Sequence, residues 1–276
     1  MPKNLISIIA RSTSIRLPQK IFSDVAGTPF LQRLVTKMQA VKRKANVVIC
    51  TSDHDSDAEL RRQAVAWKAE VYGGSLSDVM RRLINMGQQF GADNLVRVTG
   101  DNLFTSPALV DFLLHTHGLA DADFTKIDGL PLGVNADVLS LAALEDVYKN
   151  LPDGADTEYI QLYTYNPDKY KCLIHYAPVA LRRPELSLTM DHQHDLDMIR
   201  FVVERLGDDA PLEAIIKLLE SSRRAIHLAP EIQIKVPGGT KDWQEYKAFM
   251  TDIRERANAV IDPNQFANLQ TSSKFW

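Results

Sequence analysis

The sequence lacks the features that would place the protein in a membrane or on a polyanion. No apolar run approaches the roughly 18–20 residues that a membrane-spanning helix needs. Neither sign of charge is in excess, because 32 lysine and arginine residues stand against 35 aspartate and glutamate residues, for a formal net charge of −3. A chain without a strong positive field has no general attraction to nucleic acid or anionic lipid. We therefore expect neither a nucleic-acid partner nor a membrane association.

Cysteine is scarce as well. Cys50 and Cys172 are far apart in the sequence, and each stands in an apolar stretch. This favours reduced thiols in a core over a disulfide. The apolar stretch at residues 4–10 runs straight into Arg11 without a small-residue cleavage pattern, so we interpret it as a buried strand rather than a signal peptide. These features predict a cytoplasmic protein.

The sequence does contain enough apolar material for a core. Its 276 residues are 45% hydrophobic and 24% charged, which are ordinary globular proportions and exclude disorder. This length favours one large domain, or one domain with an appendage. The expected strands are residues 4–10, 47–50, 95–98 and 186–190, and the expected helices are residues 29–38, 60–67, 77–90, 106–118, 195–206, 211–221 and 243–260.

Apolar strands that alternate with helices are typical of a parallel sheet covered on both faces. We therefore predict an α/β fold with a mostly parallel sheet for residues 1–207. Strand signals become scarce beyond that point, so residues 208–276 are predicted to form a mainly helical C-terminal appendage, with a polar tail from Asn264.

Polar residues follow three of the expected strands. The segment 10–20 follows the first strand and carries Arg11, Arg16 and Lys20, Asp101 follows the third strand, and Asp191 follows the last. Ligands of open parallel sheets bind beyond the carboxyl ends of the strands, so we expect these groups to meet at one rim. Two carboxylates beside a basic, hydroxyl-rich loop would form a metal-and-phosphate site.

The basic loop is not one of the common glycine-rich phosphate motifs. Neither G-x-G-x-x-G nor G-x-x-x-x-G-K-[ST] occurs in the chain. Ser12, Thr13 and Ser14 instead offer hydroxyls and backbone N–H groups, while Arg16 and Lys20 offer cationic donors to a triphosphate. The competing interpretation is a solvated basic loop whose arginines contact nothing.

Five segments of the sequence resemble one enzyme family. They are Ala10-Arg11-x-x-Ser14-x-Arg16-Leu17-Pro18-x-Lys20, Gly74-Ser75-x-x-Asp78-Val79-Met80-x-Arg82, Arg97-Val98-Thr99-Gly100-Asp101, Pro131-x-Gly133 followed by Asp137-Val138, and Leu188-Thr189-Met190-Asp191 followed by Asp195-Leu196. These segments resemble motifs of the cytidylyltransferases that make CMP-sugars, the CMP-KDO and CMP-acylneuraminate synthetases, and especially their relatives of the spore-coat polysaccharide protein SpsF type. The resemblance spans residues 4–235.

This resemblance implies a Rossmann-like, GT-A-like nucleotidyltransferase fold. It implies an enzyme that transfers CMP from CTP to an acidic sugar or related acceptor in surface-glycan synthesis and releases pyrophosphate. Asp101 and Asp191 would hold Mg²⁺, and Lys20, Arg16 and Asp101 would be catalytic. The residues that would bind the nucleotide are Ala10, Arg11, Ser14, Arg16, Lys20, Ser75, Asp78 and Arg82. The family also implies a homodimer, with segment 131–138 reaching across.

Three alternatives stay open at this stage. One is a nucleotidyltransferase for a non-sugar acceptor that carries a phosphate or phosphonate. A second is a glycosyltransferase of the same fold that uses a nucleotide-sugar donor. Asp121-Ala-Asp123 is formally its D-x-D metal motif, although it follows an expected helix instead of a strand. A third is a catalytically silent nucleotide-binding subunit, which the presence of Asp101, Asp191, Arg16 and Lys20 disfavours.

Overall fold

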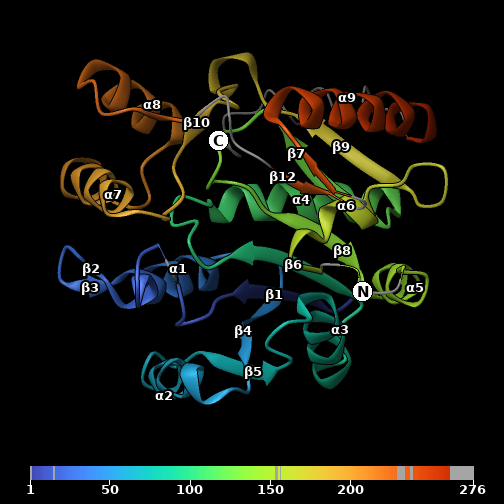
Figure 1. Ribbon diagram of the computed structural model, residues 1–276, viewed down its shortest axis with the longest axis horizontal. Helices are drawn as coiled ribbons and strands as arrows, with labels where there is room; N and C mark the ends of the chain where they lie inside the picture. The colour runs from blue at the N-terminus through green and yellow to red at the C-terminus, as the bar shows by residue number, and fades with distance from the viewer. Residues whose placement is uncertain are drawn as a thin grey trace.

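A seven-stranded sheet forms the centre of the molecule (Figure 1). The computed structural model describes residues 2–14, 16–152, 155, 157–228, 234–236 and 239–261. In spatial order the strands are β5 (Glu70–Gly74), β4 (Ala45–Ser52), β1 (Asn4–Ile9), β6 (Asn94–Thr99), β8 (Asp137–Ser140), β7 (Phe124–Asp128) and β9 (Cys172–Tyr176). β1 pairs in parallel with β4 on one side and with β6 on the other.

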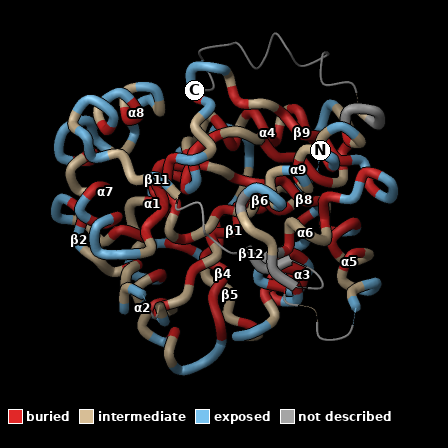
Figure 2. Tube along the Cα trace, turned by 45° about the horizontal axis from the view of Figure 1, so that its top comes forward, coloured by how far each residue is buried: buried red, intermediate tan, exposed pale blue. Residues whose placement is uncertain are grey.

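The sheet is mostly parallel, as the sequence predicts, and β8 is the exception. β8 runs antiparallel to both of its neighbours, β6 and β7. The other strands point the same way, so their carboxyl ends lie along one edge. Helices cover both faces of the sheet, so its central strands are rich in buried apolar residues, and Leu5, Ile6 and Ile8 of β1 are fully buried. Figure 2 shows the strands as the buried centre of the molecule and the outer sides of the helices as its exposed surface.

Each face of the sheet has its own hydrophobic core. The core on one face takes its helical residues from α1 (Phe30–Gln39), α2 (Ala58–Ala66), α4 (Pro107–Ala120), α7 (Gln193–Leu206) and α8 (Leu212–Ser221). The core on the other face takes them from α3 (Val79–Phe90), α5 (Leu141–Lys149) and α9 (Trp243–Val260), with the short α6 (Gln161–Thr164) nearby. Cys50 and Cys172 are buried free thiols of the second core, which confirms their predicted reduced state.

Capping side chains determine where helices α3 and α4 begin. Ser106 Oγ accepts the backbone N–H of Leu109 at 3.2 Å, with Pro107 in the first turn of α4. Asp78 Oδ1 accepts the N–H of Arg81 at 3.0 Å and starts α3. The short 3-10 turns are η1 (Lys20–Phe22), η2 (Asp55–Asp57), η3 (Thr157–Tyr159) and η4 (Val179–Leu181).

Three predicted elements differ in the structure. Pro29, expected in the first turn of a helix, instead belongs to strand β3 (Thr28–Pro29), which pairs with β2 (Asp24–Val25), and α1 begins one residue later. Helix α4 passes through the expected stop at Gly118 and ends at Ala120, because Asp121 takes the left-handed conformation that closes it. The expected strand 186–190 is only β10 (Leu186–Ser187), and it pairs with β11 (Ile226–His227) outside the central sheet.

The described part of the C-terminal region contains two helices and short strand pairs. Helix α8 packs against α7, and β12 (Ile234–Val236) pairs with β13 (Gly239–Lys241). Helix α9 lies against β9 (Figure 1), and an ion pair joins its Arg254 to Asp128 at the end of β7. The division at residue 207 stays a prediction. No helix in the described part of the chain is long and apolar enough to cross a membrane.

Candidate active site

The loop after β1 and the loop after β6 meet backbone to backbone at the carboxyl edge of the sheet. Gly100 N donates a hydrogen bond to Ile9 O at 2.7 Å. A Cβ atom on Gly100 would lie 2.8 Å from that oxygen and 2.7 Å from the Cβ of Ala10, so no larger residue fits without displacing the backbone. This close approach places the segment that carries Arg16 and Lys20 beside Asp101.

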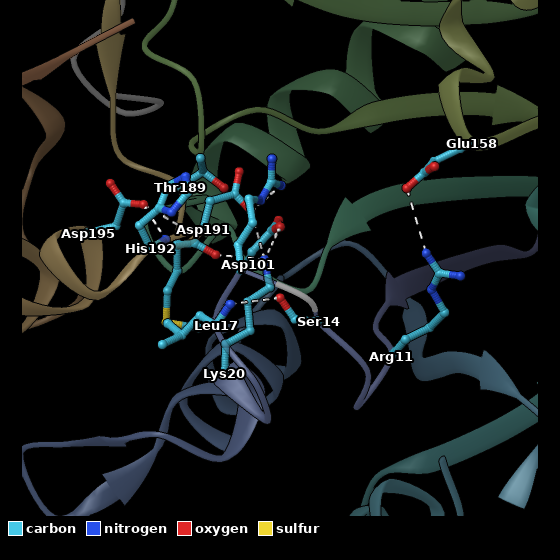
Figure 3. A network of polar contacts seen from close by, with 12 residues as sticks. Arg11, Ser14, Leu17, Lys20, Asp101, Glu158, Thr189, Asp191, His192 and Asp195 are labelled. Atoms are coloured by element: carbon cyan, nitrogen blue, oxygen red, sulfur yellow. Dashed lines mark hydrogen bonds and ion pairs between the residues drawn. The ribbon is translucent and has the colours of Figure 1, made fainter. Parts of the chain in front are cut away.

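Lys20 joins the two candidate metal aspartates. Its Nζ lies 2.9 Å from Asp101 Oδ2 and 3.0 Å from Asp191 Oδ1, and it also donates to Met190 O at 2.6 Å. Arg16 Nη2 lies 2.8 Å from the same oxygen of Asp191. Figure 3 shows the Lys20 side chain reaching up between the two carboxylates. Residues from three distant parts of the chain therefore converge on one point, as the sequence predicts.

Asp191 reaches this point by a different route from the predicted one. The residue follows no strand of the central sheet; instead Met190 N bonds to Asp101 O at 3.1 Å, and Thr189 Oγ1 bonds to Asn102 Oδ1 at 3.1 Å. The buried carboxylate of Asp195 accepts the N–H of Asp191 at 2.9 Å as part of the cap of α7. One backbone and one side-chain hydrogen bond to the segment after β6, together with a helix cap, therefore hold Asp191.

A cavity of about 1030 Å³ opens over this cluster. Its lining includes most of the residues predicted to bind nucleotide or metal, namely Ala10, Arg11, Ser14, Arg16, Lys20, Arg82, Asp101 and Asp191. Arg11 lies at the far side of the cavity from Lys20 and faces Glu158, with 3.6 Å between the charged atoms (Figure 3). The site is thus a wide cleft with cations on both sides.

The charges in the cluster stabilise one another. Burial lowers the pKa of Lys20, but the carboxylates of Asp101 and Asp191 outweigh burial and raise it above its ordinary value. Burial likewise raises the pKa of Asp191, but Lys20 and Arg16 outweigh it and hold that pKa below the usual range. Both the ammonium and the carboxylate are therefore charged at neutral pH.

Arg82 is a second cation in the cavity wall, and it is unusual because it is fully buried. Its Nη1 donates to Ser75 O, Nε and Nη2 have no partner in hydrogen-bonding geometry, and the guanidinium interacts with the buried thiol of Cys50, where it opposes the effect of burial on the thiol pKa. Among the described residues, no carboxylate forms an ion pair with it. A buried guanidinium with unused donors beside a cavity is suited to bind a ligand that carries acceptor oxygens or nitrogens.

Two predicted nucleotide-binding residues do not line the cavity. Asp78 caps α3 and also accepts Tyr148 Oη at 2.6 Å and Thr157 Oγ1 at 3.0 Å. Ser75 Oγ accepts the N–H of Asp78 at 3.1 Å, so this pair shapes the turn before α3. A direct contact of Ser75 or Asp78 with the nucleotide stays a prediction. The structure shows that the carbonyl of Ser75 accepts a hydrogen bond from Arg82 and that Asp78 caps the helix that carries Arg82.

Arg97 and Asp137 belong to two of the motifs that resemble the family, but the sequence did not predict that they pair in a buried polar network. Arg97 lines the cavity and its Nη1 lies 3.0 Å from Asp137 Oδ2, which also accepts Gln161 Nε2 at 2.8 Å. Tyr165 Oη lies 3.3 Å from the other oxygen of Asp137. The alternation of β6 adds a second signal, because Arg97 and Thr99 stand on the same face of the strand.

Asp101 and Asp191 fit a hard divalent cation. Their oxygens converge within 3.0 Å of one nitrogen, and carboxylate oxygens are the ligands that Mg²⁺ prefers. The described residues contain no group of three or more His, Cys, Asp or Glu side chains that could hold a metal. Two carboxylates match Mg²⁺, which usually keeps waters and substrate phosphates as its other ligands. The D-x-D motif of the glycosyltransferase alternative lies outside the cleft. Asp121 ends α4, and both Asp121 and Asp123 contact Lys171 instead of lining the cavity.

The sequence profile of the cytidylyltransferase family matches residues 5–221. The chain belongs to this family. Spore coat polysaccharide biosynthesis protein SpsF of Bacillus subtilis (strain 168) is 31% identical over 231 residues, which cover 78% of this chain and 93% of that protein. The 3-deoxy-manno-octulosonate cytidylyltransferase of Escherichia coli is 27% identical over 191 residues, which cover 68% of this chain and 75% of that protein. The protein is therefore a nucleotidyltransferase enzyme.

Solved structures share the fold of this cytidylyltransferase. A cytidylyltransferase from Leptospira borgpetersenii matches with a TM-score of 0.73 at 22% identity, over 81% of this chain and 96% of that one. CMP:2-keto-3-deoxy-manno-octonic acid synthetase complexed with CTP matches with a TM-score of 0.59 at 16% identity, over 74% of this chain and 99% of that one. The predicted Rossmann-like nucleotidyltransferase fold is confirmed. Helix α9 lies beyond the segment that the family profile matches.

Proposed function

We propose that this cytidylyltransferase transfers CMP from CTP to an acidic sugar or related acceptor, with Mg²⁺, in the synthesis of a surface glycan. The observation that carries the proposal is the convergence of Lys20 and Arg16 on Asp101 and Asp191 in the wall of a large cleft. The relatives support the choice of substrates, since one is named for spore-coat polysaccharide biosynthesis and another for an acidic sugar, 3-deoxy-manno-octulosonate.

Nucleotidyl transfer needs positioning and charge neutralisation more than covalent chemistry. Arg16 and Lys20 would neutralise the triphosphate and the departing pyrophosphate, because both are cations at the edge of the cleft. Arg82, which also lines the cleft, would donate its unused N–H groups to the nucleotide. A hydroxyl oxygen of the acceptor would then form a bond to the α-phosphorus as the bond to the pyrophosphate oxygen breaks.

Asp101 and Asp191 would hold Mg²⁺, which when bound polarises phosphoryl oxygens and stabilises their developing negative charge. The acceptor's attacking hydroxyl must lose its proton, which would pass to solvent water in the open cleft. Asp101 and Asp191 have one task in this proposal, which is to bind the cation.

Pyrophosphate release tests the proposal directly. The purified enzyme is incubated with CTP, ATP, GTP or UTP and Mg²⁺, together with a panel of acidic sugars. Pyrophosphate release from CTP alone, dependent on one acceptor, supports the proposal. Pyrophosphate release with phosphate- or phosphonate-bearing acceptors would favour the non-sugar alternative. Consumption of nucleotide-sugars would favour the glycosyltransferase alternative. Absence of all turnover would leave only a silent nucleotide-binding subunit.

We also infer a cytoplasmic homodimer, because the substrates are cytoplasmic nucleotides and the family resemblance implies a two-subunit enzyme. The segment 131–138 includes the start of β8 in the centre of the sheet and contacts the segment before Asp191. Light scattering coupled to gel filtration tests the dimer, since a mass near the 31.0 kDa of one chain would refute it.

A further inference from the structure

The ammonium of Lys20 lies where three oxygen atoms of the protein converge. The Lys20 ammonium contacts one oxygen of Asp101, one oxygen of Asp191 and the carbonyl of Met190. Its side chain is 13% exposed, and those of the two aspartates are 27% and 26% exposed. Three oxygens therefore surround one positive charge with little access to water. A small divalent cation binds to oxygen atoms in a similar arrangement.

We propose that Lys20 occupies the divalent-metal site in the nucleotide-free enzyme, and that it leaves this site for the triphosphate when CTP binds. The proposal rests on the proposed function, because it takes Asp101 and Asp191 as the metal ligands. It adds a second role to Lys20, which is to keep the metal site closed until the substrate arrives.

Electrostatics explains why the two cations exclude each other. Lys20 carries one positive charge and Asp101 and Asp191 carry two negative charges, so the lysine already neutralises half of the site. A divalent cation on the same two oxygens would lie within a few ångströms of the ammonium, and like charges at that distance repel strongly in a partly buried site. Metal binding without nucleotide must therefore displace Lys20 at a cost.

The triphosphate removes that cost. Its oxygens offer Lys20 a new set of acceptors at the same edge of the cleft, where Arg16 already lies. Once Lys20 contacts phosphate, both aspartates become available to the metal, so nucleotide and metal should bind with positive coupling. Lys20 can make this movement because its ammonium is at the end of a long flexible side chain, while its backbone stays fixed in η1.

The experiment measures metal binding without turnover. Mn²⁺ alone is titrated into the nucleotide-free wild type and into Lys20→Met, and free Mn²⁺ is followed by electron paramagnetic resonance. We expect Lys20→Met to bind Mn²⁺ about tenfold or more tightly than the wild type, within the usual range of coupling between ligands. Mn²⁺ should also raise the Tm of Lys20→Met by more than it raises the Tm of the wild type.

Three variants serve as controls. Lys20→Arg keeps the positive charge and should bind Mn²⁺ as weakly as the wild type. Arg16→Met removes a cation that contacts only Asp191 and is 60% exposed, so its gain should be much smaller. Lys20→Met combined with Asp191→Asn should lose the gain, because one of the proposed ligands is then neutral.

Equal Mn²⁺ affinity of the wild type and Lys20→Met, including no binding by either, would overturn the proposal. Failure of the proposed function gives a different pattern, in which the wild type releases no pyrophosphate from CTP with any acceptor. The Mn²⁺ titrations decide the role of Lys20 in that case too, since they need no substrate and no turnover.

Discussion

The carboxylate of Asp57 holds the backbone of Ser12 in place. Asp57 Oδ1 accepts the N–H of Ser12 at 2.6 Å, and its other oxygen accepts the hydroxyl and the N–H of Ser52. Asp57 is fully buried, and these bonds outweigh burial and keep its pKa below the usual range. The N–H of Ser12, which the sequence offered as a phosphate donor, is therefore already used to orient the basic loop.

Asp57→Asn should weaken CTP binding more than it slows the chemical step. The amide nitrogen would face the donors of Ser52 or Ser12, and a lost bond to a buried charged acceptor costs about 1.5–3 kcal/mol. We expect the KM for CTP to rise about tenfold with a smaller change in kcat, as steady-state kinetics would show. Asp55→Asn, an exposed residue of the same turn, is the matched control. An unchanged KM would assign Asp57 to stability alone.

Asp101→Asn and Asp191→Asn should each lower kcat by orders of magnitude and leave the fold intact. Both residues stand in loops at the cleft, and an amide cannot supply the negative charge that a divalent cation needs. Pyrophosphate release measures the loss, and circular dichroism checks the fold. Asp121→Asn provides the control, because that side chain is exposed and contacts only Lys171. Turnover near that of the wild type in either variant would contradict the metal assignment.

Arg82→Met should weaken nucleotide binding without lowering the free energy of unfolding. A buried guanidinium without an anionic partner is costly, so an apolar side chain of similar length should keep or raise the free energy of unfolding. The KM for CTP should rise, since the unused N–H groups are lost. Urea denaturation and steady-state kinetics measure the two effects, with the exposed neighbour Arg81→Met as control. A destabilised variant with normal KM would show that Arg82 serves the fold only.

Because two histidines are buried, we expect the free energy of unfolding to fall in mild acid. Burial lowers the pKa of His117 to about 4 and that of His175 to about 3, so both are neutral in the native state. The unfolded chain takes up their protons as the pH falls below the ordinary value near 6.5, so stability is full above that pH and declines towards pH 4. The contribution of His117 reaches at most about 3 kcal/mol. Urea unfolding at pH 7.5 and pH 5 should show a smaller difference in His117→Gln than in the wild type.

The sequence predicts the parts of the molecule that local rules determine. Strands β1, β4 and β6 are short segments rich in apolar residues, and α4 begins at a serine followed by proline, so composition and capping suffice to place them. Arg16, Lys20 and Asp101 could be assigned to one rim, because parallel strands end at the same edge of a sheet.

The missed features depend on contacts between distant residues. The hydrogen bond that brings Met190, and with it Asp191, to Asp101 uses backbone atoms, which leave no pattern in the sequence. Asp57 stands in a polar turn and gives no sign that it is buried against Ser12. The pairing of Arg97 with Asp137 depends on the antiparallel β8, which the alternation of strands and helices did not predict.

Gly133 shows how a remote packing fault would reach the reaction. A Cβ atom at this position would lie 2.3 Å from Thr189 N and 2.4 Å from the carbonyl carbon of Leu188, and its φ is +97°. A methyl group there would displace the backbone of Leu188 and Thr189, which immediately precedes Asp191. An enzyme with alanine at this position should retain every catalytic side chain and still misplace one of them, so a screen confined to the cleft would overlook the cause of its inactivity.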